Sequence, residues 1–340
     1  MKLKKSVLIT GGAGFIGSNF IPYFLDQNPE TKVINLDKLT YAGNLSNLDD
    51  VSFNKNYTFI QGDICNRDLI EKIFNEHAFD AVINFAAESH VDNSIENPDE
   101  FIKTNIVGTF NLLDVSKNYW MDAPNQYKTG YEYNRFHHIS TDEVYGTLGD
   151  TGLFTEQTPY APNSPYSASK ASSDFIVRSY FHTYGMNVVT TNCSNNYGPK
   201  QHDEKLIPTI IRKAINGEQI PIYGNGKNIR DWLYVLDHCK GIDLVFNEGK
   251  SGETYNIGGH NERDNMYIAN KICEILDEIK PQTESYKKQI SFVKDRPGHD
   301  FRYAIDASKI ENELDWKAVE NFETGIKKTI DWYLDKYKNV

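Results

Sequence analysis

The sequence predicts a doubly wound α/β protein, in which helices cover both faces of a parallel sheet and a smaller C-terminal lobe follows. Three features predict this fold class. Short β-branched runs alternate with longer stretches of helical period up to about residue 193. A glycine-rich turn follows the first of these runs. Beyond residue 193 the chain becomes rich in glycine, proline, aromatic and charged residues, which indicates a second lobe of loops and short elements.

Six apolar runs are the predicted strands of the sheet, at residues 6–10, 32–37, 57–63, 80–87, 135–141 and 187–194. Segments of helical period separate them, as in successive βαβ units. A chain of 340 residues exceeds the usual size of a single core. We therefore expect residues 1–192, with about 232–257, to form the larger domain, and residues 193–231 and 258–340 to form the smaller one.

Charge and cysteine usage narrow the functional class. A net charge of -11 argues against general nucleic-acid or anionic-membrane binding, so an anionic ligand must meet particular arginines. The apolar run at residues 6–10 is too short for a signal peptide, and no other run approaches the ~20 residues of a membrane span. The four cysteines are scattered without a CxxC pair, which favours burial in a reduced, cytoplasmic protein over a disulfide framework or a metal site.

The turn "TGGAGFIG" after the first strand is typical of dinucleotide binding. Gly11, Gly14 and Gly17 allow a tight turn that points a helix N-terminus at a pyrophosphate. A glycine turn with an unrelated acid nearby is the alternative. However, the second strand ends at Asp37, whose carboxylate can accept both ribose hydroxyls and repels a 2′-phosphate. This combination predicts NAD in preference to NADP.

The motif "YSASK" follows the fifth strand. Tyr166 and Lys170 lie four residues apart, so on a helix the two side chains share a face. An ammonium in that position can lower the pKa of the phenol and let it act as a base near neutral pH. The pair is common by chance, but here it follows a dinucleotide turn.

These motifs resemble the extended short-chain dehydrogenase/reductase family through "TGGAGFIG", "NFAA" at residues 84–87, and Tyr166 with Lys170. "AAESHVD", "ISTDEVYG", "SPYSASKASSD", "NCSNNYGP", "EKLIP", "PIYGNG", "IRDWLYV" and "DRPGHD" resemble its dTDP-glucose 4,6-dehydratase branch across nearly the whole chain. The resemblance implies a Rossmann domain with tightly bound NAD, a C-terminal lobe that binds the nucleotide sugar, and a homodimer that pairs two helices of each chain.

The resemblance also assigns the residues that end the fifth strand. Thr141 orients the reacting oxygen of the substrate, Asp142 is an acid and Glu143 is a base. Dehydration of a hexose needs a base for the C5 proton and an acid for the departing C6 hydroxyl, and adjacent carboxyl groups push their pKa values apart. A pair of solvated acids at a strand end is the structural alternative. A nucleotide-sugar 4-epimerase needs neither acid, and a non-catalytic dinucleotide-sensing protein needs none of these side chains.

The binding residues are also implied by the resemblance. Beside the glycines and Asp37, the NAD set is Phe15, Ile16, Lys38, Thr40, Asp63, Ile64, Ala86, Ala87, Thr104, Tyr166, Lys170 and Asn196. The nucleotide-sugar set is Ser89, Thr141, Asn195, Lys205, Leu206, Pro208, Pro221, Tyr223, Arg230, Asn265, Arg296 and His299.

Four positions of these motifs carry a further expectation or an open alternative. Arg230 and Arg296 suit a pyrophosphate because a guanidinium offers two donors at once, although a surface arginine more often forms an ion pair. Tyr223 either presents its ring to the base or is a core tyrosine. Asn93 departs from the arginine expected after "SHVD", so no contact is expected from that position.

Overall fold

The computed structural model describes residues 5–338. The basic start of the chain and the outer limits of the two predicted domains, residues 1 and 340, lie outside the described residues. A seven-stranded sheet dominates the fold, in the order β12-β8-β7-β4-β1-β2-β3, and every neighbouring pair in it is parallel. The strands are β1 Ser6–Thr10, β2 Lys32–Asp37, β3 Tyr57–Gln61, β4 Ala81–Asn84, β7 Arg135–Thr141, β8 Val188–Cys193 and β12 Thr254–Ile257.

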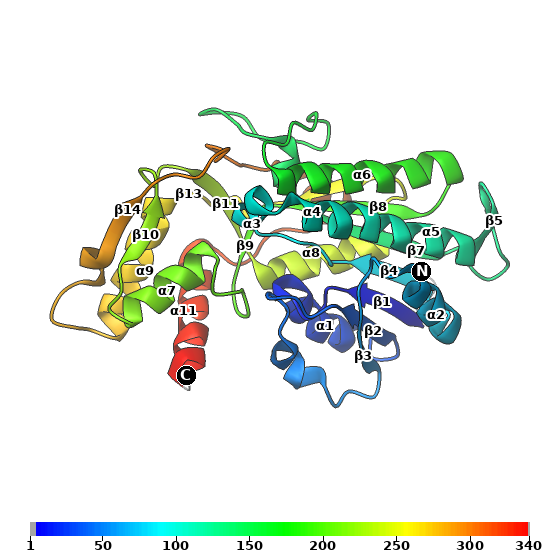
Figure 1. Ribbon diagram of the computed structural model, residues 1–340, viewed down its shortest axis with the longest axis horizontal. Coiled ribbons are helices and arrows are strands. Elements are labelled where there is room, and N and C mark those ends of the chain that lie inside the picture. The colour runs from blue at the N-terminus through cyan, green and yellow to red at the C-terminus, as the bar shows by residue number, and fades with distance from the viewer. Residues whose placement is uncertain (1–4, 339–340) are drawn as a thin grey trace.

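Helices cover both faces of this sheet (Figure 1). α1 Phe15–Gln27 and α8 Val235–Glu248 pack on one face, and α2 Arg67–His77, α5 Thr109–Trp120 and α6 Pro165–Tyr184 pack on the other. Along β1, Val7 and Ile9 belong to the first core and Leu8 to the second, because successive side chains of a strand point to opposite faces. The predicted α/β fold class is confirmed.

The six predicted strands are all present, and three of them are shorter than expected, β8 by one residue at each end. β3 ends at Gln61 and β4 at Asn84, so residues 62–63 and 85–87 leave the sheet at its carboxyl edge. The helix α6 begins at a capping box between Ser164 and Ser167, with Pro165 in its first turn, and ends at Gly185 in the left-handed conformation. Local sequence therefore defines both ends of the helix that carries Tyr166.

The smaller lobe is built on two short sheets and three helices, at the left of Figure 1. Its strands are β9 Asn195–Tyr197, β11 Ile229–Tyr234 and β13 Glu262–Asp264 in one sheet, and β10 Ile220–Tyr223 and β14 Ile290–Val293 in the other. The helices α7 Leu206–Ile215, α9 Asn265–Ile279 and α11 Phe322–Lys338 enclose a separate apolar core.

Short elements complete the described chain. They are η1 Leu45–Val51, α3 Val91–Glu96, α4 Pro98–Phe101, η2 Ile102–Gly108, β5 Met121–Ala123, β6 Gln126–Tyr127, η3 Asp142–Tyr145, η4 Tyr286–Gln289 and α10 Ser308–Leu314. Among residues 5–338, every helix is too short or too polar to cross a bilayer. Cys193, Cys239 and Cys273 are buried as expected, whereas Cys65 is only partly buried.

One segment departs from the predicted domain boundaries. Residues 258–340 were assigned to the smaller domain, yet Ala307, Ile310 and Trp316 lie in the core between the large sheet and α8. α10 contacts both α8 and β12, because the apolar side of this short helix covers the end of the large sheet that β12 forms. The remaining boundaries stay a prediction.

Candidate active site

A cavity of about 310 Å³ lies at the carboxyl ends of the parallel strands, where ligands bind in open α/β sheets. Every residue of the predicted NAD set lines this cavity: Gly11, Gly14, Phe15, Ile16, Gly17, Asp37, Lys38, Thr40, Asp63, Ile64, Ala86, Ala87, Thr104, Tyr166, Lys170 and Asn196. The parallel topology brings them together, because the carboxyl ends of all these strands meet at one edge of the sheet.

The floor of the cavity is the turn between β1 and α1. Gly11 has a φ of 71°, and a Cβ on it would lie 2.6 Å from the backbone nitrogen of Ala86. A Cβ on Gly17 would lie 2.5 Å from the carbonyl oxygen of Gly11. No side chain caps α1 at Gly14, so its first-turn amides are presented at the cavity. This cradle fits a pyrophosphate.

At the end of β2, Asp37 is buried beneath the same turn. Its Oδ2 accepts a hydrogen bond from the Ala13 amide at 2.9 Å, and its Oδ1 accepts one from the Leu39 amide at 2.8 Å. Burial raises the pKa of this carboxyl group, and the two amides oppose that shift. Lys38 forms an ion pair with Asp63 at 2.9 Å. Asp37 is thus held in place for a ribose, and the residues around the cavity fit a dinucleotide.

Asp142 and Glu143 lie side by side in η3, directly after β7, but their surroundings differ. Asp142 is 1% exposed, and within the described chain its Oδ2 has no hydrogen-bond partner. Burial, then the charges of Glu143 and Asp231, raise the pKa of Asp142 well above its usual range. Glu143 is only partly buried, and its positive neighbours oppose the rise of its pKa caused by burial. These neighbours are Arg296, Arg230 and Lys205.

Among the described residues, no hydrogen bond joins Tyr166 to Lys170. The Lys170 ammonium donates to the carbonyl oxygen of Ile139 at 2.8 Å, on β7. Burial and the charge of Glu143 raise the pKa of Tyr166 well above its usual range, while a hydrogen bond with Thr141 lowers it. Tyr166 and Lys170 nevertheless line the same cavity, and a lowering of the Tyr166 pKa by the Lys170 charge stays a prediction.

The predicted nucleotide-sugar residues divide into two groups. Ser89, Thr141, Asn195 and Lys205 line the cavity. The other group lies outside the cavity lining, in segments 206–299: Leu206, Pro208, Pro221, Tyr223, Arg230, Asn265, Arg296 and His299.

Two members of the outer group contact α3 of the larger lobe. Arg296 Nη1 lies 3.2 Å from Asp92 Oδ1, and the Tyr223 hydroxyl donates to Asp92 Oδ2 at 3.2 Å. Tyr223 is 41% exposed, so the alternative that it is a core tyrosine is wrong. Asp92 therefore joins the two lobes through the side chains expected to bind the nucleotide.

Arg230, which was expected to bind a pyrophosphate, is a buried side chain. Its guanidinium donates to the backbone oxygens of Ile229 and Asp300 at 2.7 and 3.0 Å and lies 4.2 Å from the ring centre of Tyr303. Both contacts fix the orientation of the group. Its charge nevertheless opposes the rise in the pKa of Glu143, so it lies close to the acid pair.

Sequence reasoning missed several polar residues of the cavity. Glu88, Gln201, His202 and Glu204 line it, and the Tyr41 hydroxyl donates to Glu204 Oε1 at 3.3 Å. Glu88 and Glu204 lie within the motifs "AAESHVD" and "EKLIP", which were a signal for them, whereas Gln201 and His202 lie between "NCSNNYGP" and "EKLIP" and had no motif of their own. Asn93, the departure from the expected arginine, donates its amide to Nδ1 of the α3 cap His90 at 3.4 Å.

Comparisons with known proteins agree with this geometry. A family model described as GDP-mannose 4,6 dehydratase matches residues 8–329. A Xanthomonas campestris pv. campestris (strain B100) protein named dTDP-glucose 4,6-dehydratase is 55% identical over 329 residues, covering 96% of this chain and 92% of that protein. The crystal structure of dTDP-glucose 4,6-dehydratase from Bacillus anthracis in complex with NAD is 45% identical, with a TM-score of 0.86 and 98% of both chains covered. That of the Streptomyces venezuelae enzyme, with NAD and TYD bound, is 41% identical, with a TM-score of 0.89 and the same coverage.

Proposed function

The chain belongs to the dTDP-glucose 4,6-dehydratase family, and from that premise we propose that its cavity residues convert dTDP-glucose to dTDP-4-keto-6-deoxyglucose. The chain is an NAD-dependent hydro-lyase of nucleotide-sugar metabolism, which supplies a precursor of deoxysugars. The observation that carries the residue assignment is the acid pair: adjacent carboxyl groups, one enclosed with other acids and the other faced by three cations.

The glycine turn after β1 and Asp37 at the end of β2 would bind different parts of NAD. The α1 amides suit the pyrophosphate, Asp37 suits the adenosine ribose, and Tyr166, Lys170 and Asn196 lie toward the other end of the cavity. Bound NAD supplies the oxidation at C4 of the sugar and the reduction at C6. Since one turnover leaves the cofactor unchanged, it acts as a prosthetic group.

Tyr166 is the base for the C4 hydroxyl proton in this proposal. Thr141 hydrogen-bonds the phenol and so also holds the substrate oxygen near it. Because Tyr166 is neutral in its present surroundings, it needs a positive charge nearby before it can accept a proton. Lys170, one helical turn further along α6, supplies that charge from within the same cavity.

Glu143 and Asp142 then remove water across C5 and C6. A ketone at C4 acidifies the C5 proton, which Glu143 takes in its ionised form. Asp142, kept protonated by burial and by two neighbouring acids, gives its proton to the departing C6 hydroxyl. Separate environments thus provide one base and one acid from consecutive residues.

The nucleotide end of the substrate would lie between α3 and the smaller lobe. Arg296 offers a guanidinium for the diphosphate and Tyr223 offers an exposed ring. Both now contact Asp92, so the diphosphate would compete with that carboxylate for Arg296.

Purified protein incubated with dTDP-glucose tests the reaction. We expect a 4-keto-6-deoxy product, with deuterium placed at C4 of the substrate recovered at C6. Formation of the galactose epimer would favour a 4-epimerase, and absence of any sugar conversion would favour a dinucleotide-sensing role. Deuterium lost to solvent would overturn the retained-cofactor scheme.

A homodimer is part of the proposal, and it is supported by an apolar surface on the helices beside the active site. Ile102, Val107 and Phe110 on η2 and α5 are 50%, 44% and 41% exposed, and Phe175 on the neighbouring α6 is 58% exposed. α5 and α6 run side by side at the top of Figure 1. Light scattering should find twice the chain mass of 38.9 kDa, and Phe175→Glu should reduce it to one chain.

The cellular location and the two-domain division are also proposals. Scattered cysteines, three of them buried, support a reducing compartment and hence the cytoplasm. Separate apolar cores around the large sheet and around α7, α9 and α11 support two domains.

A further inference from the structure

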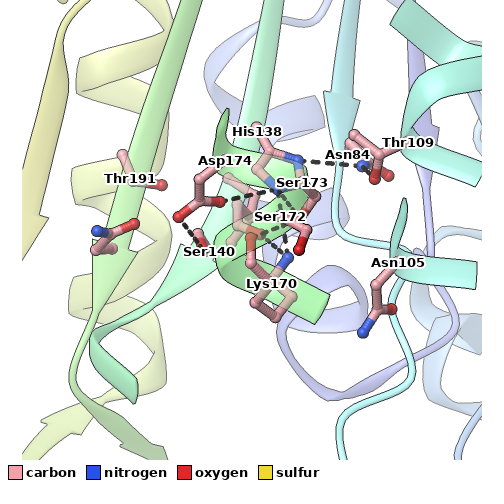
Figure 2. Close-up of polar contacts among 12 residues, drawn as sticks. Asn84, Asn105, Thr109, His138, Ser140, Lys170, Ser172, Ser173, Asp174 and Thr191 are labelled. Carbon is pink, nitrogen blue, oxygen red and sulfur yellow. Dashed lines mark hydrogen bonds and ion pairs between the residues drawn. The ribbon is translucent and has the colours of Figure 1, made fainter. Parts of the chain in front are cut away.

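A buried polar network adjoins the Lys170 ammonium (Figure 2), and three of its members, His138, Ser173 and Asp174, lie outside the cavity lining. His138 on β7 is central to it. Its Nε2 lies 3.4 Å from Lys170 Nζ, 3.3 Å from Ser173 Oγ and 3.3 Å from Asp174 Oδ1. All four side chains are buried. Burying polar groups costs free energy unless they form hydrogen bonds with one another, so the donors and acceptors in this network must be matched.

Hydrogen bonds from two other strands determine which His138 nitrogen carries the proton. The Thr10 hydroxyl donates to Asn84 Oδ1 at 2.6 Å, so the amide nitrogen of Asn84 is the group that faces His138. That nitrogen can only donate, and it lies 3.2 Å from His138 Nδ1. Nδ1 is therefore the acceptor of the neutral ring, and the proton is on Nε2.

The Nε2 proton decides where the Lys170 ammonium can point. A protonated Nε2 cannot accept from Lys170, so His138 limits the ammonium by its position and not by a hydrogen bond. The Ser173 hydroxyl donates to the Lys170 carbonyl at 2.8 Å, which leaves its oxygen free to accept from Nε2. Lys170 Nζ donates once, to Ile139 O, so its other two protons are left for the cavity that it lines.

Asp174 supplies the negative charge nearest to this ammonium. It follows Lys170 by one turn of α6, so both lie on the same face of the helix. Its Oδ2 accepts from the Ser140 hydroxyl at 2.9 Å and from the Tyr160 hydroxyl at 3.0 Å. These donors and the His138 ring hold the carboxylate at a fixed place near Lys170. A buried ammonium needs such a partner.

We propose that His138 and Asp174 are positioning residues, which keep the Lys170 ammonium charged and directed into the cavity. This inference rests on the proposed function of Lys170. Burial lowers the pKa of Lys170, and the charge of Asp174 opposes that shift. Burial also lowers the pKa of His138 to about 4, so the ring stays neutral at working pH. The other titratable groups facing Lys170 are Cys193 on β8 and Tyr166 on α6.

Removing the charge of Asp174 is the main test. Asp174→Asn and Asp174→Ser both remove it, so that one variant remains if the other does not fold. Lys170 must be charged to act, and activity is lost as pH rises through its pKa. Without Asp174 that pKa falls, so the alkaline limb of the kcat profile should move down by about one pH unit, and kcat at a pH on that limb should fall about tenfold with KM little changed. Asp174→Glu should keep the original limb.

His138 is tested by loss and rescue. His138→Leu should lower kcat about tenfold because the carboxylate loses its fixed place. His138→Gln should stay within about threefold of the unchanged protein, because its side-chain amide can donate to Ser173 Oγ as Nε2 does. Ser172→Ala is the matched control on α6, since within residues 5–338 the Ser172 hydroxyl bonds only to the carbonyl oxygen of Ala168, one turn before.

A direct titration of Lys170 separates this inference from the function on which it rests. In protein with ¹³C-labelled lysine side chains, the resonance missing from Lys170→Met identifies Lys170. We expect its titration midpoint to fall in Asp174→Asn and to stay unchanged in Ser172→Ala. An unchanged midpoint and an unchanged alkaline limb would overturn the inference while Lys170→Met is still inactive. Normal turnover of Lys170→Met would instead overturn the proposed role of Lys170.

Discussion

Two short segments that line the cavity, η3 and the start of α6, differ in what surrounds their ionisable side chains. In η3, Asp142 and Glu143 are adjacent in sequence, yet one is enclosed with Glu143 and Asp231 while the other faces cations of the smaller lobe. In the first turns of α6, Tyr166 and Lys170 are spaced to share a face, yet no hydrogen bond joins them in the described chain. Closeness in sequence therefore does not predict that Asp142 and Glu143 have different surroundings. Helical spacing likewise does not predict that Tyr166 and Lys170 share a hydrogen bond.

The comparison shows what decides the protonation of each group. The pKa of a carboxyl group depends on the charges nearest to it in space. For Glu143 these charges are Arg230 on β11, Arg296 in the loop before α10 and Lys205 in the loop before α7. The orientation of the Lys170 ammonium on α6 is set instead by β7, the strand against which the helix packs, through the carbonyl oxygen of Ile139. If this view is right, the acid pair should respond to changes in the smaller lobe and the α6 pair should not.

The largest effect is expected from the phenol itself. Tyr166→Phe removes the base for the first step while leaving the ring packed against Phe101. Turnover of dTDP-glucose should fall by about 10²–10⁴-fold, measured as 4-keto product. Tyr180→Phe, on the same helix and away from the cavity, is the control. Near-normal turnover in Tyr166→Phe would assign the base to another residue.

The acid pair should fail at a later step than Tyr166. Asp142→Asn cannot protonate the leaving hydroxyl, and Glu143→Gln cannot take the C5 proton, so product formation should fall about 10²–10³-fold in each. In a single turnover the absorbance of reduced nicotinamide should persist in both variants, because oxidation at C4 still occurs. Asp150→Asn, an exposed acid in the segment after η3, should behave normally. Product at the usual rate without that absorbance would remove Asp142 from the acid role.

A change in the smaller lobe should act on Glu143 and spare Tyr166. Arg296 is the first of the cations that oppose the raised pKa of Glu143. In Arg296→Met that pKa rises, and because Glu143 acts when ionised, the acid limb of kcat moves to higher pH. KM for dTDP-glucose should also rise about tenfold or more with the loss of a charged hydrogen bond. Arg178→Met, an exposed arginine on α6, should change neither quantity. An unmoved acid limb would mean that Glu143 does not depend on Arg296.

The smallest effect is expected at the contact between the lobes. Asp92→Asn weakens the hold on Arg296 and Tyr223, both of which the substrate would use. A partly exposed ion pair contributes about 0–1 kcal/mol, so KM should fall by no more than about fivefold and kcat should stay the same. Asp99→Asn, exposed on α4, is the control. A rise in KM would show that Asp92 assists binding and does not compete with it.

Much of the fold and of the cofactor site was predictable because it depends on local signals. β-branched runs identified six of the seven strands, and the glycine turn and Asp37 identified the dinucleotide edge. The seventh strand, β12, was missed because its short run lies between glycines, with Gly249 and Gly252 before it and Gly258 and Gly259 after it. The departure at Asn93 carried no information about the hydrogen bond that its backbone amide donates to the side chain of His90.

The sequence by itself determined six of the seven strands of the large sheet, the glycine cradle and the order of the proposed catalytic side chains along the chain. Only the tertiary structure decided that Glu143 faces Arg296, that Lys170 turns to Ile139, and that His138 and Asp174 lie near it. The physical reason is the distance along the chain between the interacting residues. Strands and turns follow from residues a few positions apart, whereas the charge state of a buried group is set by whichever distant segments pack within a few ångströms of it.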